Sequence, residues 1–218
     1  MDQLIFKFPF SKKYFEQDFF ISSNNFSAYK LVESWPTWPG KWLNIYGDSG
    51  SGKTHLSKIL EKKIDKLHLI DAKDVNDSTI ETLVNFDCLI IDNFNKNIDE
   101  KLLYSILNQS KLFENYVLIN STQCIKNFVF NLKDLQSRMN SFLYIGIELP
   151  TDDLLKVIIS KTFSDKQINI DPKISEFIVK NIERSYKKMF KFLKDIDELS
   201  LSTGKSININ LIKKALDQ

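Results

Sequence analysis

One eight-residue window constrains this chain more than any other feature: Gly47-Asp48-Ser49-Gly50-Ser51-Gly52-Lys53-Thr54. It fits the phosphate-binding loop pattern G-x-x-x-x-G-K-[S/T]. Glycines let the backbone curl so that successive N–H groups point at a phosphate. Lys53 supplies a positive charge for the outer phosphates, and Thr54 supplies a hydroxyl for Mg²⁺. The window therefore predicts that the chain binds a nucleotide.

The residues around this window fit the same interpretation. Residues 42–46 (WLNIY) are typical of a short strand that runs into the loop. Residues 54–63 are typical of a helix with Leu56, Ile59 and Leu60 on one face. A strand, a loop and a helix are the setting that such a site needs, because the helix N-terminus adds partial positive charge at the phosphates.

Further strand-like runs predict an α/β core. They lie at residues 67–70, 88–91, 116–120 and 143–147, and helical patterns separate them. One such pattern is the apolar stripe Ile98, Leu102, Leu103, Ile106, Leu107 and Phe113. Alternating strands and helices indicate a parallel sheet covered on both faces. After Pro150 only helices are expected, at about 152–163, 172–182, 185–202 and 208–216.

Composition narrows the class of protein. A formal charge of +2 in 218 residues is not a general nucleic-acid signature, and 43% hydrophobic residues can form a substantial core. Cys88 and Cys124 are expected to be free thiols in a reducing compartment, and the two histidines have no ligand spacing to them. No apolar run approaches membrane-spanning length, and no signal peptide is evident, so a cytoplasmic location is expected.

A second motif indicates where a metal ion would be held. The apolar run Cys88–Ile91 ends at Asp92, as a Walker B strand places a carboxylate beside Mg²⁺. The next residue is Asn93, where ATPases of this kind usually carry a second acid. An amide orients water but does not take its proton. Slow or absent hydrolysis by the isolated protein is therefore expected.

These residues together resemble the AAA+ ATPases of the DnaA group and, within it, the short Hda-type regulators of DnaA. Seven further segments carry the resemblance. They are the adenine-covering segment Phe15–Ile21 with Asn24–Ala28, the run Trp35–Pro39, the loop extension His55-Leu56, the arginine-finger box Leu135–Met139, and the lid segments Asp152–Leu155 and Glu183–Tyr186.

The resemblance implies an AAA+ core with a five-stranded parallel sheet over residues 11–150, followed by a helical lid subdomain over 151–218. It implies ADP or ATP as ligand with Mg²⁺ on Thr54 and Asp92, and places Phe20 and Ile21 at the adenine. Arg138 would be an arginine finger that acts on a partner's nucleotide, and Arg184 the lid arginine at the protein's own nucleotide. The strand end that carries the polar sensor in this family reads Asn120-Ser121-Thr122 in place of its usual Asp; Asn120, or alternatively Thr122, would contact the phosphate region.

The N-terminal residues 1–10 contain Gln3-Leu4-Ile5-Phe6, which resembles the short peptide that docks replication proteins onto the sliding clamp. The alternative is an amphipathic terminal strand that packs on its own core. By resemblance the expected partners are DnaA and the sliding clamp of DNA polymerase III, with a possible homo-oligomer through the AAA+ interface. Because the chain stops at Gln218, directly after the lid helices, no sequence-specific DNA binding is expected.

Three other functions remain open at this level. A nucleoside or small-molecule kinase has a similar loop and length, but the stretch after Pro150 is not rich in arginine as a kinase lid would be. A helicase-loading or DNA-remodelling AAA+ ATPase would bind single strands with a steep salt dependence. A binding module without nucleotide is the third, against which the intact loop and Asp92 argue.

Overall fold

A computed structural model describes residues 14–204 and 206–216. These residues form two compact units, 14–148 and 149–216, which we call the sheet unit and the helical unit. The sequence places the boundary between residues 150 and 151. The predicted clamp peptide, residues 1–10, lies outside the described residues.

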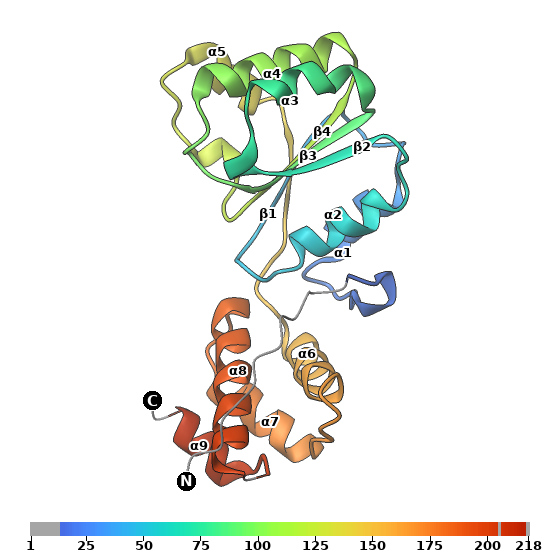
Figure 1. The fold of residues 1–218 in the computed structure, drawn as a ribbon. Helices are drawn as coiled ribbons and strands as arrows, with labels where there is room; N and C mark the ends of the chain where they lie inside the picture. The colour runs from blue at the N-terminus through green and yellow to red at the C-terminus, as the bar shows by residue number, and fades with distance from the viewer. Residues whose placement is uncertain (1–13, 205, 217–218) are drawn as a thin grey trace. The chain divides into compact units, whose positions relative to one another are not determined.

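A five-stranded parallel sheet forms the centre of the sheet unit, with strand order β2-β3-β4-β1-β5 (Figure 1). The strands are β1 (Trp42–Tyr46), β2 (Leu67–Asp71), β3 (Cys88–Phe94), β4 (Tyr116–Ser121) and β5 (Leu143–Gly146). Their positions confirm the five strands expected from the apolar runs. The strand β3 continues past Asp92, and an irregularity in its pairing with β4 lies between Ile91 and Phe94.

Helices cover both faces of this sheet (Figure 1). On one face lie α1 (Phe26–Glu33) and α2 (Lys53–Glu61), and on the other lie α3 (Asp77–Thr82), α4 (Glu100–Leu112) and α5 (Lys133–Met139). Short 3₁₀ turns complete the unit at η1 (Glu16–Asp18), η2 (Ala72–Asp74), η3 (Leu83–Asn85) and η4 (Ile125–Asn127). Side chains alternate across β3, so that Ile90 packs toward α2 while Leu89 and Ile91 pack toward α4. Burial on both faces explains the continuous apolar runs.

The apolar stripe expected here is correct within α4 but not at its two ends, and the first of these, Ile98, precedes the helix, which begins at Glu100. Leu103, Ile106 and Leu107 are buried, whereas Phe113 is 40% exposed. The reason is that α4 ends at Leu112, and Phe113 is its C-cap. Its position no longer follows the helical period that would bring it to the core.

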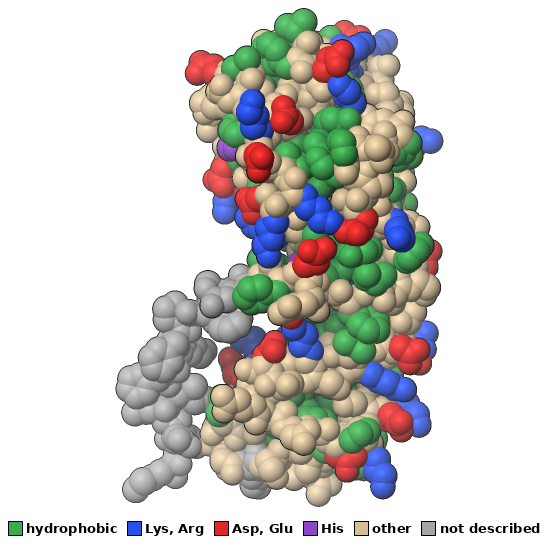
Figure 2. All heavy atoms as spheres, turned by 90° about the vertical axis from the view of Figure 1, so that its right-hand side faces the viewer, with side chains coloured by type: hydrophobic (Ala, Val, Ile, Leu, Met, Phe, Trp, Pro, Cys, Tyr) green, Lys and Arg blue, Asp and Glu red, His purple; other side chains and the backbone are tan. Residues whose placement is uncertain are grey.

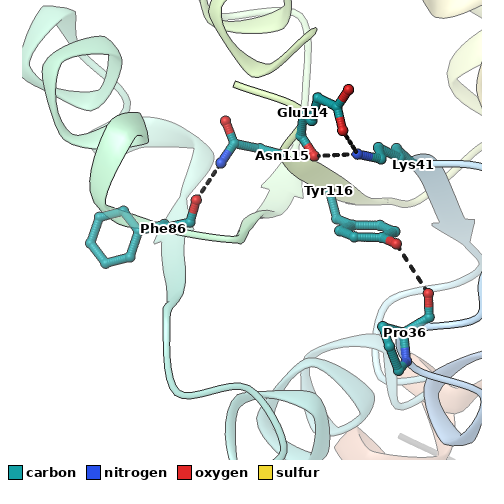
Figure 3. Close-up of polar contacts among 6 residues, drawn as sticks. All are labelled: Pro36, Lys41, Phe86, Glu114, Asn115 and Tyr116. Atoms are coloured by element: carbon teal, nitrogen blue, oxygen red, sulfur yellow. Dashed lines mark hydrogen bonds and ion pairs between the residues drawn. The ribbon is translucent and has the colours of Figure 1, made fainter. Parts of the chain in front are cut away.

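Polar contacts fasten the loops at the amino-terminal edge of the sheet (Figure 3). Lys41 Nζ donates to the carbonyl oxygen of Glu114 at 2.8 Å and to its Oε2 at 3.0 Å. Tyr116 donates its hydroxyl to the carbonyl of Pro36, and the Asn115 side chain donates to the carbonyl of Phe86. These bonds join the starts of β1 and β4 to the loops beside them.

The helical unit consists of α6 (Asp152–Ser164), α7 (Pro172–Asn181), α8 (Tyr186–Thr203) and α9 (Ile209–Leu216). Side-chain caps begin the first two: Thr151 Oγ1 accepts from Leu154 N, and Asp171 accepts from Lys173 N. The helices enclose one apolar core that includes Leu155, Ile159, Phe163, Ile178, Met189, Leu193, Ile196 and Ile212. The helix-only stretch predicted after Pro150 is confirmed.

Charged side chains of both signs are intermingled on the face seen in Figure 2. This mixture agrees with the small net charge of +2. None of the helices in the described ranges is both long enough and apolar enough to cross a membrane.

Candidate nucleotide site

The phosphate-binding loop lies at the carboxyl end of β1 and leads into α2. Gly50 and Gly52 have φ of 89° and 101°, which only glycine adopts without strain. A Cβ on Gly47 would lie 2.7 Å from the carbonyl oxygen of Ile147, so only glycine fits there. Asp48, Ser49 and Gly50 are exposed along the loop, whereas Ser51 and Lys53 are buried. The structure thus brings together the predicted loop residues, with the crest open to a ligand.

The Lys53 ammonium is held inside this loop. Its Nζ donates to the carbonyl oxygens of Gly47 at 2.6 Å and Asp48 at 2.9 Å. Burial lowers the pKa of Lys53, and the charges of Asp92 and Asp48 oppose that shift. A phosphate at the loop would add negative charge beside Lys53 and stabilise its charged form.

Thr54 and Asp92 meet where the first turn of α2 faces the end of β3. Thr54 Oγ1 donates to Asp92 Oδ2 at 2.7 Å. Neighbouring oxygen ligands of an octahedral Mg²⁺ lie about 3 Å apart, given metal–oxygen distances of about 2.1 Å. The hydroxyl and the carboxylate therefore fit two adjacent positions around this ion, and binding of Mg²⁺ by Thr54 and Asp92 stays a prediction.

Asn120, on the strand β4 next to Asp92, is fully buried. Its side-chain nitrogen donates to Asp92 Oδ1 at 3.0 Å and to Ser57 Oγ at 2.7 Å. In this arrangement Asn120 orients the Asp92 carboxylate, and its expected contact with the phosphates stays a prediction. The alternative residue, Thr122, is exposed directly after β4.

Asn93 is exposed and has a left-handed backbone, with φ of 55°. Its side-chain nitrogen donates to Asp71 Oδ2 at 2.7 Å. Asp71 is the last residue of β2, and its Oδ1 also accepts the backbone N–H of Lys73 at 3.1 Å. The Asn93 amide, with the Lys73 N–H, holds the pKa of the Asp71 carboxyl below its usual value.

The segment before α1 lies against the phosphate-binding loop. The Phe19 ring approaches Gly52 so closely that a Cβ there would be 2.9 Å from it. His55, in the first turn of α2, is 2.7 Å from the Phe15 carbonyl oxygen through Nε2 and meets the Phe19 ring edge-on. Phe20 and Ile21, the predicted adenine contacts, are 43% and 41% exposed next to this junction. Asn25 holds their turn, since its side-chain nitrogen donates to the Phe20 carbonyl at 2.9 Å.

Arg138 lies near the end of α5, at the opposite edge of the sheet. Its guanidinium carbon is 5.7 Å from the ring centres of Trp42 and Tyr104, and one nitrogen donates to Asn108 Oδ1 at 2.5 Å. Trp42 begins β1 whereas the loop follows Tyr46, so four residues of strand, about 13 Å, separate the two ends. Arg138 is therefore half-buried against its own chain and lies at the end of β1 opposite its own phosphate loop.

Arg184 belongs to the helical unit, where its guanidinium forms an ion pair with Asp152 at 2.9 Å. Both side chains are well exposed. Its predicted role at the nucleotide stays a prediction, as does that of Gln3, Leu4, Ile5 and Phe6.

Sequence reasoning missed Asp71 and the contact between Phe19 and Gly52. Asp71 was detectable, because it closes an apolar strand just as Asp92 does. Phe19 carried no signal that separates it from its aromatic neighbours.

Comparison with known proteins finds similarity to the replication initiator DnaA both in sequence and in fold. No family model matches the chain. The replication initiator DnaA of Buchnera aphidicola (subsp. Cinara cedri) is 26% identical over 235 residues, and that of Borreliella burgdorferi is 26% identical over 249 residues. These alignments cover 95% and 98% of this chain but 53% and 49% of the relatives, so the chain spans about half of their length.

Domain III of Thermotoga maritima DnaA superposes with a TM-score of 0.75 at 17% identity, covering 96% of this chain and 98% of that domain. DnaA of Aquifex aeolicus, solved with AMPPCP, gives a TM-score of 0.67 at 19% identity over 88% of this chain and 67% of its own. These likenesses confirm the α/β fold of AAA+ type with its five-stranded parallel sheet. The chain is thus similar to DnaA in sequence and has the fold of DnaA domain III.

Proposed function

We propose that this DnaA-like AAA+ domain binds ADP or ATP with Mg²⁺ and regulates the initiation of chromosomal DNA replication. The observation that carries the proposal is the meeting of Lys53, Thr54 and Asp92 around an exposed loop crest. The Aquifex relative is described as bound to AMPPCP, an ATP analogue, which supports an adenine nucleotide as the ligand.

Each part of the nucleotide would have its own contacts. The loop N–H groups and Lys53 would bind the phosphates, and Mg²⁺ on Thr54 and Asp92 would neutralise their charge. The exposed apolar surface of Phe20 and Ile21 would cover the base. Asn120 would act through Asp92, whose carboxylate it contacts.

The regulatory part rests on the position of Arg138. A guanidinium at the amino-terminal edge of the sheet is separated from its own loop by the length of β1, so its phosphate target would belong to another molecule. We infer that this target is the ATP of a DnaA protomer, whose hydrolysis an arginine finger accelerates by stabilising charge on the transferred phosphate. Docking on the sliding clamp through Gln3, Leu4, Ile5 and Phe6 would bring the two proteins together. This part of the proposal rests on the resemblance of the chain to Hda-type regulators.

The test measures ATP hydrolysis by DnaA in the presence of clamp loaded on DNA and of this protein. Arg138→Ala is expected to reduce the stimulation by about 10³-fold, the lower range for arginine fingers. Lys133→Ala is the matched control, because Lys133 is an exposed cation on the same helix; its stimulation should stay within twofold of the wild type. Equal stimulation by Arg138→Ala and the wild type would contradict the proposal.

The same similarity to DnaA supports a second function, that of an initiator which uses ATP for its own assembly. The assay separates the two functions, since an initiator would assemble on origin DNA with ATP and would not stimulate hydrolysis by added DnaA.

A further inference from the structure

An acid, Asp71, ends β2, and an amide, Asn93, lies near the end of β3, where ATPases of this kind usually carry the acid. At position 93, directly after the predicted metal ligand Asp92, the chain has an amide. A carboxylate is nevertheless present beside it, because Asp71 on the neighbouring strand accepts a hydrogen bond of 2.7 Å from the Asn93 side chain. The acid that position 93 lacks is therefore one strand away.

The sheet register brings Asp71 to the same face as the nucleotide site. Asp71 is paired with Asp92 between the parallel strands β2 and β3. Residues directly opposite each other in neighbouring strands point to the same face. The packing agrees, since Leu69 and Ile90 contact the same core beneath α2. Asp92 uses this face to contact Thr54, so Asp71 faces the region beside the predicted phosphates.

The Asp71 carboxylate is oriented but not saturated by the contacts that the structure gives. Oδ2 accepts from Asn93 and Oδ1 accepts from the Lys73 N–H. An ionised carboxylate has about four acceptor positions, so two donors fix its plane and leave capacity for a water molecule. Asp71 is half-buried and Asn93 is exposed, which leaves the pair accessible to solvent.

We propose that Asp71 is the base for ATP hydrolysis by this chain and that Asn93 positions it. The inference rests on the proposed binding of ATP. The oxygen of a water held by Asp71 forms a bond to the γ-phosphorus, while the bond from that phosphorus to the bridging oxygen of ADP breaks. The water proton passes to the Asp71 carboxylate and then to solvent, and ADP leaves with the electron pair of the broken bond.

The experiment measures ATP turnover together with the affinity for fluorescent ATP and ADP and the thermal midpoint. The wild type is expected to hydrolyse ATP slowly, at a rate above that of Lys53→Ala. Asp71→Asn is expected to lose about 100-fold or more of this rate, the range for a general base. Its nucleotide affinities should stay within about twofold. Asp74→Asn is the matched control, because Asp74 is an exposed acid three residues away, and its rate should equal that of the wild type.

A second variant separates chemistry from structure. The exchange variant Asp71→Asn/Asn93→Asp keeps one acid and one amide in contact but returns the acid to β3. It is expected to recover turnover to within about tenfold of the wild type, which a purely structural role for the pair would not produce.

The outcomes distinguish this inference from the proposed function. If the wild type does not bind nucleotide, both are wrong. If it binds nucleotide but turns over no faster than Lys53→Ala, or if Asp71→Asn keeps the wild-type rate, only the role of Asp71 is wrong.

Discussion

The two units of this chain differ in what they bury. The interior of the helical unit is almost wholly apolar, and Ser175 is its one buried polar residue within the described ranges. The remaining buried polar residues all belong to the sheet unit and include Asn44, Lys53, Asp92, Asn115 and Asn120. Because a buried polar group without a partner is costly, such groups persist where they serve folding or a ligand.

Within the sheet unit, hydrogen-bond partners separate these two purposes. Asn44 and Asn115 form hydrogen bonds with backbone groups and so stabilise the loops beside them. Asn120 donates to Asp92, Asp92 accepts from Thr54, and Lys53 donates to the loop carbonyl of Asp48. These side chains therefore lie together at the carboxyl edge of the sheet, beside the exposed loop. Burial of a polar group alone therefore does not identify a ligand site. Its position at the carboxyl edge of the parallel sheet does.

The strongest test of this contrast is Phe163→Ala in the helical unit. Phe163 is fully buried in the apolar core, so its truncation is expected to cost about 3–5 kcal/mol of unfolding free energy. All three tryptophans (Trp35, Trp38 and Trp42) lie in the sheet unit, so their fluorescence follows that unit alone. In denaturant titrations, circular dichroism should show the loss while the tryptophan transition moves little.

Lys180→Ala, an exposed position on α7, serves as control for that variant and should change neither transition. An equal shift of both signals in Phe163→Ala would show that the two units unfold together and that their cores are not independent.

A smaller effect is expected for Asn44→Ala in the sheet unit. The Asn44 side chain donates to the Ile119 carbonyl and the Ser121 hydroxyl, both at 2.8 Å, and accepts from the Ile125 N–H at 3.0 Å. Removing these bonds leaves buried groups without partners and is expected to cost about 2–3 kcal/mol. Here the tryptophan transition should shift. Asn44→Leu restores the volume but not the hydrogen bonds. A stability equal to the wild type in that variant would show that the hydrogen bonds of Asn44 do not stabilise the sheet unit.

The smallest effect concerns the surface ion pair of Glu33, at the end of α1, with Lys63, in the turn that follows α2. The bond from Lys63 lowers the pKa of Glu33, but about a third of each side chain is exposed. Glu33→Gln should therefore cost less than about 1 kcal/mol at neutral pH. Since the folded-state pKa is lowered, the carboxylate stabilises the fold above its unfolded pKa. The difference between the variant and the wild type should disappear as the pH falls through the lowered value.

Urea titrations at several pH values check this expectation, with Glu81→Gln, an exposed acid of the same unit, as control. A difference that grows toward acid pH would contradict the sign of the pKa shift.

Much of the site was predictable because its signals are local. The loop Gly47–Thr54, the carboxylate of Asp92 and the five strands depend on neighbours in sequence, whose spacing sets the backbone conformation and the buried faces. The end of α4 was less predictable, since Phe113 satisfies the apolar period although the helix has already ended.

The sequence by itself determined that an acid closes β2, that an amide follows Asp92 and that an arginine lies near the end of α5. Only the tertiary structure decided that Asp71 lies beside Asn93 and that Arg138 is held by Asn108 at the edge opposite the loop. The physical reason is that strand order and register are set by packing across the whole sheet, and these contacts join residues 22 and 30 positions apart in the chain.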